Sequence, residues 1–358
     1  MPPGGIASST KEVFDGQLRG ATHRGGRLWQ SRWGARRGGD ALPELRLVAA
    51  ADPDAEARRR VAAFDEGVSS FESLADLLDA VDIDAVLIAT PHDVLAPLAL
   101  SAIRAGKHVL IEKQMALNEA QAKEVEFAAA SADVTCMVGY SFRYGMARHV
   151  QDLLAQGAVG DVQAITGSIG TPRLDSGWFA QPESGGGPLL SVGCHLIDLA
   201  LWFVAEEPAS VWADVHRRSD TGVDDTSTIH LGFGEGRVAE FLVTQSAASF
   251  FYDLQVIGRS GSVALRGRNF VQFEVEVHST AIAAYREPTI IRPTMQRDHI
   301  TTMLVPELAG FSDAIEHRRP PAITASDGRR VLRVLDAVGE SARMRQAVAL
   351  GTPLLSAY

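Results

Sequence analysis

The chain contains 358 residues, 46% of them hydrophobic and 22% charged, a composition typical of a soluble globular protein long enough for two domains. Its formal net charge of −10 argues against nucleic acid as a partner, because phosphate binding requires a basic surface. The two cysteines, Cys136 and Cys194, have no metal-ligand spacing, which favours reduced, buried thiols and no metal site. We find no apolar run approaching the roughly 18 residues of a membrane span, and we expect a cytoplasmic protein without a membrane partner.

Short apolar strands alternate with amphipathic helices between residues 45 and 138. The pattern predicts strands at 45–51, 85–89, 108–111 and 135–138. It predicts helices at 55–65, 71–80, 94–105 and 118–131, with Ser73 as a cap and Gly106 as a stop. This alternation indicates an α/β fold of right-handed βαβ units around a doubly wound parallel sheet of Rossmann type.

Polar residues follow three of these strands. Because open parallel sheets bind ligands outside the carboxyl ends of their strands, we predict that these residues bind a ligand. They are Asp52, Thr90, Pro91, His92, Glu112 and Lys113.

The pattern changes after Arg143. A helix at 149–156 precedes strands at 162–168, 210–215, 226–233, 237–244, 254–257 and 262–266, and helices follow at 306–317 and 325–348. Glycine turns join the strands, which is typical of an antiparallel sheet. We therefore expect a C-terminal α+β domain with an open antiparallel sheet, which begins near Gly139.

The block from Gly185 to Trp202 carries three glycines, then an apolar helix with His195 near its start. Ordinary core packing requires no such combination. Together with Glu112-Lys113, the block indicates a lysine and a histidine acting on one substrate. The alternatives are a solvated Glu-Lys pair and a histidine that only caps the helix or packs in the core.

Seven short motifs stand in a characteristic order, at 51–54, 89–91, 105–113, 138–143, 157–162, 185–202 and 323–328. Over about residues 41–350 the chain resembles the Gfo/Idh/MocA oxidoreductases. The resemblance implies a Rossmann NAD(P)-binding domain at 41–138 and an α/β substrate and oligomerisation domain at 139–358, whose C-terminal helices are free to pack back on the first. It also implies hydride transfer between a nicotinamide and a polyol, sugar or related small-molecule substrate, by a homo-oligomer, a dimer or tetramer.

The chemistry of these residues agrees with that reaction. Oxidising an alcohol requires a hydride acceptor and a base for the hydroxyl proton. The positive charge of a nicotinamide disfavours the ammonium form of a nearby lysine, so we assign Lys113 as the base. His195 shares the proton or holds the substrate hydroxyl. Candidate substrate contacts are Arg143, Ser191 and Asp198, the last with an ordinary polar helix residue as its alternative.

Three positions depart from the family pattern. Gln114 replaces the proline of Glu-Lys-Pro, Ser191 replaces an aspartate four residues before His195, and Leu95 replaces a histidine for which His92 is a possible substitute. Unlike aspartate, serine brings no negative charge that would raise the basicity of His195. A second function therefore stays open, that of a non-catalytic ligand-binding or regulatory member of the family. A glycosidase using transient oxidation is a third.

The N-terminal segment, 1–40, is aberrant or poorly ordered. Asp52 suits the ribose of NAD, with NADP kept open, and a G-x-G-x-x-G turn is expected roughly 20 residues earlier. Instead, 23–39 is crowded with arginine, glycine and tryptophan. One interpretation is a divergent N-terminus. The other is a frame-shifted reading: with suitable codons, 24–33 read one base later gives AAVGYGSLAG. As written, we expect the chain to bind cofactor weakly or not at all.

Overall fold

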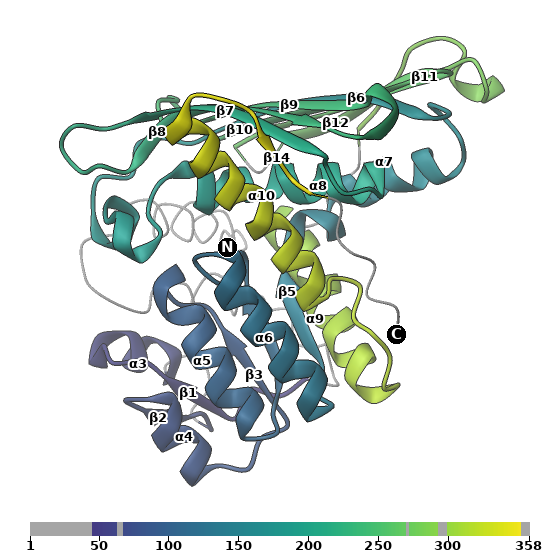
Figure 1. The fold of residues 1–358 in the computed structure, drawn as a ribbon. Helices are drawn as coiled ribbons and strands as arrows, with labels where there is room; N and C mark the ends of the chain where they lie inside the picture. The colour runs from purple at the N-terminus through teal and green to yellow at the C-terminus, as the bar shows by residue number, and fades with distance from the viewer. Residues whose placement is uncertain (1–44, 63–66, 270–271, 293–298, 352–358) are drawn as a thin grey trace, which may run out of the picture. The chain divides into compact units, whose positions relative to one another are not determined.

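The structure is a computed structural model that describes residues 45–62, 67–269, 272–292 and 299–351 (Figure 1). The segment 1–40, with both interpretations of its sequence, lies outside the described residues. The chain forms two compact units. The first contains the chain up to Gly139 together with Leu174–Gly186 and Ile300–Gly328, and the second contains the remainder from Tyr140 onward.

The first unit is built from parallel strands and the helices that connect them. Its strands are β1 (Ala49–Ala51), β2 (Ser69–Phe71), β3 (Ala85–Ile88), β4 (His108–Glu112) and β5 (Cys136–Gly139). Its helices are α3 (Ala55–Ala62), α4 (Leu74–Ala80), α5 (His92–Arg104), α6 (Glu119–Ala132) and most of α9 (His299–Glu316). The predicted elements are confirmed to within a few residues, with two exceptions: the sequence did not predict β2, and α9 begins seven residues before the helix predicted at 306–317.

Local side chains explain where these helices begin and end. Ser73 caps α4 by accepting a hydrogen bond from the Asp76 amide at 3.1 Å, and Asn118 caps α6 in the same way. Gly106 follows α5 with φ at 72°, a conformation that glycine adopts without steric cost. The predicted cap and stop are confirmed.

The parallel strands form two separate sheets rather than one. Among the described residues, β1 pairs with β2, while β3, β4 and β5 form a second sheet in that order. The Rossmann-type class is confirmed, but the expected continuous sheet is interrupted between β1 and β3.

The second unit is dominated by a nine-stranded sheet. In spatial order its strands are β13 (Thr289–Ile291), β12 (Gln272–Ser279), β11 (Gly261–Arg268), β10 (Phe251–Gly258), β6 (Val162–Gly170), β9 (Val238–Thr244), β8 (Asp224–Gly232), β7 (Ser210–Arg217) and β14 (Val348–Ala349). Only β6 and β9 pair in parallel. The predicted sheet is therefore present, although it is mixed, and β12, β13 and β14 were missed.

The two faces of this sheet differ. On one face buried side chains such as Val211, Ile229 and Phe241 form the core, covered by α7 (Met146–Ala155) and α8 (Cys194–Val204), with α10 (Ala325–Met344) alongside (Figure 1). The other face exposes large apolar side chains, including Trp212 and Leu242. An antiparallel sheet commonly has one packed and one open face.

Pro182–Val204 is long and apolar enough, by length and composition, to cross a membrane. The expectation that no run approaches that length is therefore wrong. However, 78% of the most apolar 18-residue window is buried within the protein. The stretch is also divided into a short 3₁₀ turn, a π-helical turn at Leu189–Gly193 and α8. These features are those of a core helix, whose apolar side chains are covered by protein.

Candidate active site

Lys113 lies immediately after β4, in a tight turn. The Lys113 amide donates a hydrogen bond of 3.0 Å to the Glu112 carboxylate, and the Met115 amide donates one of 3.0 Å to the Glu112 carbonyl. The peptide between Lys113 and Gln114 is cis, and Met115 has φ at 63°. Glu112 thus pairs with the backbone of this turn and defines where the lysine leaves the sheet.

The motif at 323–328 packs against this turn and against β5. A Cβ on Gly328 would collide with the sulfur of Met115 and lie 3.0 Å from Val138 Cγ2. The Val138 amide donates to the Ile323 carbonyl at 3.1 Å. A glycine is therefore required where the N-terminal turn of α10 approaches the segment after Lys113. This explains why the motif accompanies the lysine.

His92 begins α5, directly after Thr90 and Pro91. Its side chain is buried, and its Nδ1 lies 2.9 Å from the Gly185 carbonyl oxygen. Burial, reinforced by the positive charge of Lys113, lowers the pKa of His92 to about 3. The imidazole is therefore neutral near pH 7, with Nδ1 donating its proton to that carbonyl.

Gln114 lies beside this histidine. Its side chain is fully buried, and its Nε2 atom stands 3.3 Å from His92 Nδ1. The edge of the Trp178 ring contacts the imidazole, with the ring centroids 4.3 Å apart. Gln114 and His92, which mark two of the departures from the family pattern, are thus partners in one buried cluster.

The three glycines of the 185–202 block each make room for a specific neighbour. Gly185 has φ at 76°, and a Cβ there would stand 2.9 Å from His92 Cβ. A Cβ on Gly186 would collide with the Phe179 carbonyl, and one on Gly187, with φ at 103°, with the Asp224 carboxylate. Close packing and left-handed backbone therefore require this run of glycines.

Asp224, which the sequence did not single out, holds the start of the helical block. Its carboxylate is 4% exposed and accepts a hydrogen bond of 2.8 Å from the Leu189 amide. Burial raises the pKa of Asp224 to about 6, against the opposing effect of that hydrogen bond. In the π-helical turn that follows, the Ser191 hydroxyl donates to the Gly187 carbonyl at 2.7 Å. Ser191 thus bonds to the backbone four residues earlier.

His195 is the second residue of α8 and is held between aromatic rings. It stacks on Phe142 with ring centroids 4.1 Å apart and planes 9° from parallel, and the edge of Tyr140 approaches it at 6.0 Å. The imidazole is 5% exposed. Its orientation is defined by this packing, as a proton-transfer or substrate-orienting group requires.

Arg143 and Asp198 form a bidentate ion pair. Arg143 Nε donates to Asp198 Oδ2 at 2.9 Å and Nη2 to Oδ1 at 2.6 Å. Both side chains are buried, and the guanidinium also lies 5.3 Å from the centroid of the Trp202 ring. These two predicted substrate contacts are therefore bonded to each other. Their role toward a substrate stays a prediction.

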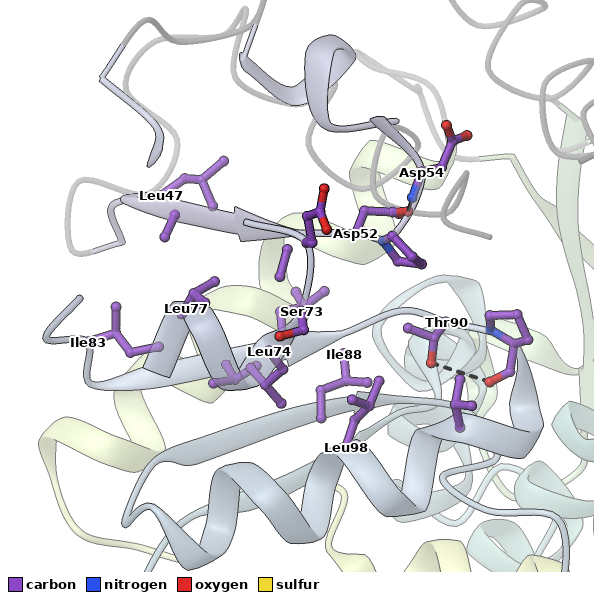
Figure 2. Close-up of a pocket in the computed structure, with 18 of the residues that line it drawn as sticks. Leu47, Asp52, Asp54, Ser73, Leu74, Leu77, Ile83, Ile88, Thr90 and Leu98 are labelled. Atoms are coloured by element: carbon purple, nitrogen blue, oxygen red, sulfur yellow. Dashed lines mark hydrogen bonds between the residues drawn. The ribbon is translucent and has the colours of Figure 1, made fainter. Parts of the chain in front are cut away.

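The other predicted cofactor residues lie at the carboxyl ends of β1 and β3. Asp52 accepts a hydrogen bond of 2.8 Å from the Asp54 amide, and burial raises the pKa of its carboxyl. Asp52, Thr90 and Pro91 line one cavity of about 1650 Å³ within the first unit (Figure 2).

The described residues fit part of a nicotinamide dinucleotide. Asp52 stands where a carboxylate would receive the ribose, and Thr90, Pro91 and Lys113 follow strands at the carboxyl edge where a nucleotide binds. The glycine turn expected to hold the pyrophosphate falls outside the described residues. Within the described part of the chain, no three His, Cys, Asp or Glu side chains gather as a metal site.

A parallel-sheet unit with a lysine after β4, combined with a large mixed sheet, defines a two-domain dehydrogenase. Residues 27–140 match the model of the oxidoreductase family with an NAD-binding Rossmann fold, and 147–264 match the GFO/IDH/MocA C-terminal domain. The chain is 30% identical to 1,5-anhydro-D-fructose reductase of Ensifer adhaerens over 80% of its own length and 85% of that enzyme. The chain therefore belongs to the Gfo/Idh/MocA oxidoreductase family, which confirms the resemblance.

Two further comparisons agree. Trans-1,2-dihydrobenzene-1,2-diol dehydrogenase of Xenopus laevis is 33% identical over 56% of the chain, an alignment that spans 62%, less than two thirds, of that relative. A solved structure of levoglucosan dehydrogenase in complex with NADH and levoglucosan shares the fold, with a TM-score of 0.80 and 20% identity over 90% of this chain and 97% of that one. The predicted fold, enzyme class and NAD-binding family are confirmed.

Proposed function

We propose that the chain transfers a hydride between NAD and a hydroxyl-bearing carbon of a polyol, sugar or related small molecule, with Lys113 and His195 as its acid–base pair. NADP stays open as the alternative cofactor. The observation that carries the proposal is the turn after β4, in which Glu112 and the packing of Gly328 define where Lys113 leaves the sheet. A lysine fixed at the carboxyl edge of a Rossmann sheet is placed for proton transfer at the cofactor's reactive end.

The oxidation removes two hydrogens from one alcohol. When bound, NAD supplies the acceptor for the hydride that leaves the substrate carbon. The Lys113 amine takes the hydroxyl proton as the carbon–oxygen bond becomes a carbonyl. Reduction is the reverse, with the Lys113 ammonium donating that proton.

His195 supplies the second proton-carrying group in this proposal. Phe142 and Tyr140 pack against its ring and fix the plane of the imidazole. A ring nitrogen would therefore form a hydrogen bond to a substrate hydroxyl in one defined direction. Arg143 and Asp198, bonded to each other, stay the proposed substrate contacts, and their mutual pairing would hold both side chains in one orientation.

A test is NADH formation, followed by absorbance, with a panel of cyclic polyols and sugars. The assay uses a high NAD concentration, because the chain as written is expected to bind the cofactor weakly. We expect slow turnover with at least one member and, for Lys113→Ala, a loss of kcat of about 10²-fold or more. Lys107→Ala is a matched control, since Lys107 lies in the turn before β4 and forms a surface pair with Asp82. Equal turnover by Lys113→Ala and the control would contradict the assignment of the base.

A non-catalytic ligand-binding relative is the second candidate. The Ser191 hydroxyl, at the position of the family aspartate, donates to a backbone carbonyl and brings no negative charge to His195. This function predicts that polyols or sugars bind, by calorimetry, without NADH formation at any NAD concentration.

We also propose that the protein is a cytoplasmic homo-oligomer. The open face of the nine-stranded sheet exposes Trp212, Leu242 and Ile257, and apolar side chains on a broad open face are typical of subunit contacts. Light scattering after size exclusion would show a dimer or tetramer, and Leu242→Lys would lower the mass toward that of one chain. An unchanged mass would exclude this face as the contact.

A further inference from the structure

A large apolar cavity lies between β1 and β3. Its volume of about 1650 Å³ exceeds the roughly 300–1,000 Å³ of an ordinary ligand pocket. Figure 2 shows apolar side chains from both sides of this space, including Leu47, Leu77, Ile88 and Leu98. A space of this size and character is suited to a segment of polypeptide.

Two sheet edges border the cavity. Among the described residues, β1 pairs only with β2 and β3 only with β4. The side chains of Ala85, Val86 and Leu87 in β3 are half-buried, although parallel strands are normally covered on both faces. Open edges leave backbone donors and acceptors without partners, so the two edges and the cavity together define a place for one more strand.

The ends of the cavity define the direction of that strand. Asp52 follows β1 and Thr90 follows β3, and both line the cavity near the same end (Figure 2). A strand inserted parallel to its neighbours would therefore end between them. A glycine turn at that end would direct its amides toward the phosphates of a bound dinucleotide.

We propose that this cavity is the position at which a first βα unit belongs, and that residues 12–40 are the product of two compensating frame shifts in the DNA that encodes it. The 44 residues before Leu45, which itself lines the cavity, suffice for a strand of about six residues, a turn and a helix of about twelve. Residues 24–33, read one base later with suitable codons, yield an apolar strand end and G-x-G-x-x-A. The proposal rests on the NAD-binding part of the proposed function and not on its substrate.

The first experiment reads the DNA that encodes residues 12–40. We expect another frame to encode an apolar strand followed by a G-x-G-x-x-[G/A] turn in place of the stretch rich in arginine, glycine and tryptophan. If neither alternative frame contains such a turn, the proposal is overturned.

The second experiment compares the full chain as written with the full chain in the restored frame, both without substrate. We expect the restored chain to melt about 5 °C higher or more without cofactor, since a central strand pairs with both open edges. The backbone amides of Ala85–Ile88 should exchange with deuterium at least tenfold more slowly in the restored chain. NAD, followed by nicotinamide fluorescence or calorimetry, should bind at least tenfold more tightly.

The variant Asp52→Ala in the restored chain distinguishes the effect of strand insertion from the effect of cofactor binding. This variant should keep the slow exchange of β3 but lose NAD affinity. Tight, saturable NAD binding by the chain as written, or equally fast β3 exchange in both chains, would overturn the proposal. Restored NAD binding and β3 protection without turnover of any polyol or sugar would support it while contradicting the proposed substrate class.

Discussion

The Nδ1 atom of His92 lies 2.9 Å from the carbonyl oxygen of Gly185, a residue 93 positions further along the chain. This contact joins the start of α5 to the first glycine of the glycine–histidine block. It also helps to explain why residue 185 is a glycine, because Leu117 Cδ2 and His92 Cβ occupy the space that a side chain would need. The neutral histidine and the glycine therefore depend on each other.

Gly185→Ala should lower the free energy of unfolding by about 2–4 kcal/mol, because the new methyl group meets both a left-handed φ of 76° and the side chains of His92 and Leu117. Urea denaturation followed by circular dichroism measures the change. Gly157→Ala is the matched control, since Gly157 has φ at 79° but open space around its Cα. Equal losses in the two variants would show that backbone strain alone, and not contact with His92, explains the effect.

His92 should make the protein less stable in acid. Its pKa is lowered to about 3 in the fold from an unfolded value of about 6.5, so between these values the unfolded chain binds a proton that the folded chain does not. Stability conferred by the neutral ring is complete above about pH 6.5 and falls by up to about 1.4 kcal/mol per pH unit below it. His92→Gln should remove this contribution, as measured by urea titrations from pH 7 to 4. A slope unchanged by the substitution would mean that the ring is protonated in the fold.

The contribution of Asp224 to the free energy of unfolding should change with pH in the opposite direction to that of His92. Burial raises its pKa to about 6, above the unfolded value of about 3.9, so the folded chain binds the extra proton between these values. Its contribution favours folding at about pH 4 and is lost as the pH rises toward 6. Asp224→Asn keeps an acceptor for the Leu189 amide and should remove this loss, so that the stability of the variant rises more steeply with pH between 4 and 6. Identical slopes for the two proteins would contradict the raised pKa.

The Arg143–Asp198 pair should show strong coupling. Asp198→Asn or Arg143→Met alone removes the bidentate partner of a buried charge and should cost about 3–5 kcal/mol. The double variant should cost less than the sum of the two, because the same ion pair is lost only once. A thermodynamic cycle from urea denaturation gives the coupling free energy. Additive losses would indicate that the two groups are stabilised by different neighbours.

The order of elements and the family were predictable because local patterns carry them. The alternation of strand and helix from residue 45 onward and the cap at Ser73 depend on neighbouring residues. One missed strand, β12, alternates over eight residues, a local signal that the prediction did not use. The other missed strands are short: β2 and β13 have three residues each, and β14 has two. Such segments are strands because a neighbour pairs with them, which no local signal reveals.

The sequence supplies a set of candidate site residues but not the contacts between them. The sequence placed Arg143 and Asp198 among substrate contacts, yet their charges neutralise each other inside the fold. Asp224 drew no attention, because a single aspartate before a strand looks like a surface residue until burial and the Leu189 amide are seen. Likewise, the sequence presents Gln114 and His92 as two unrelated departures from the family pattern. Only the structure shows that Gln114 Nε2 lies 3.3 Å from His92 Nδ1.

The chain order of strands, helices, glycines and the Glu112-Lys113 pair already predicts the dehydrogenase family and its fold, since these signals depend on residue type and spacing. The aberrant composition of 23–39 likewise indicated that a turn was missing. Burial, pairing and the open edges of β1 and β3 depend on segments distant in the chain, and only their packing in space revealed them. That packing relates the unrecognised motif to one cavity, whose lining residues and bordering strands are defined.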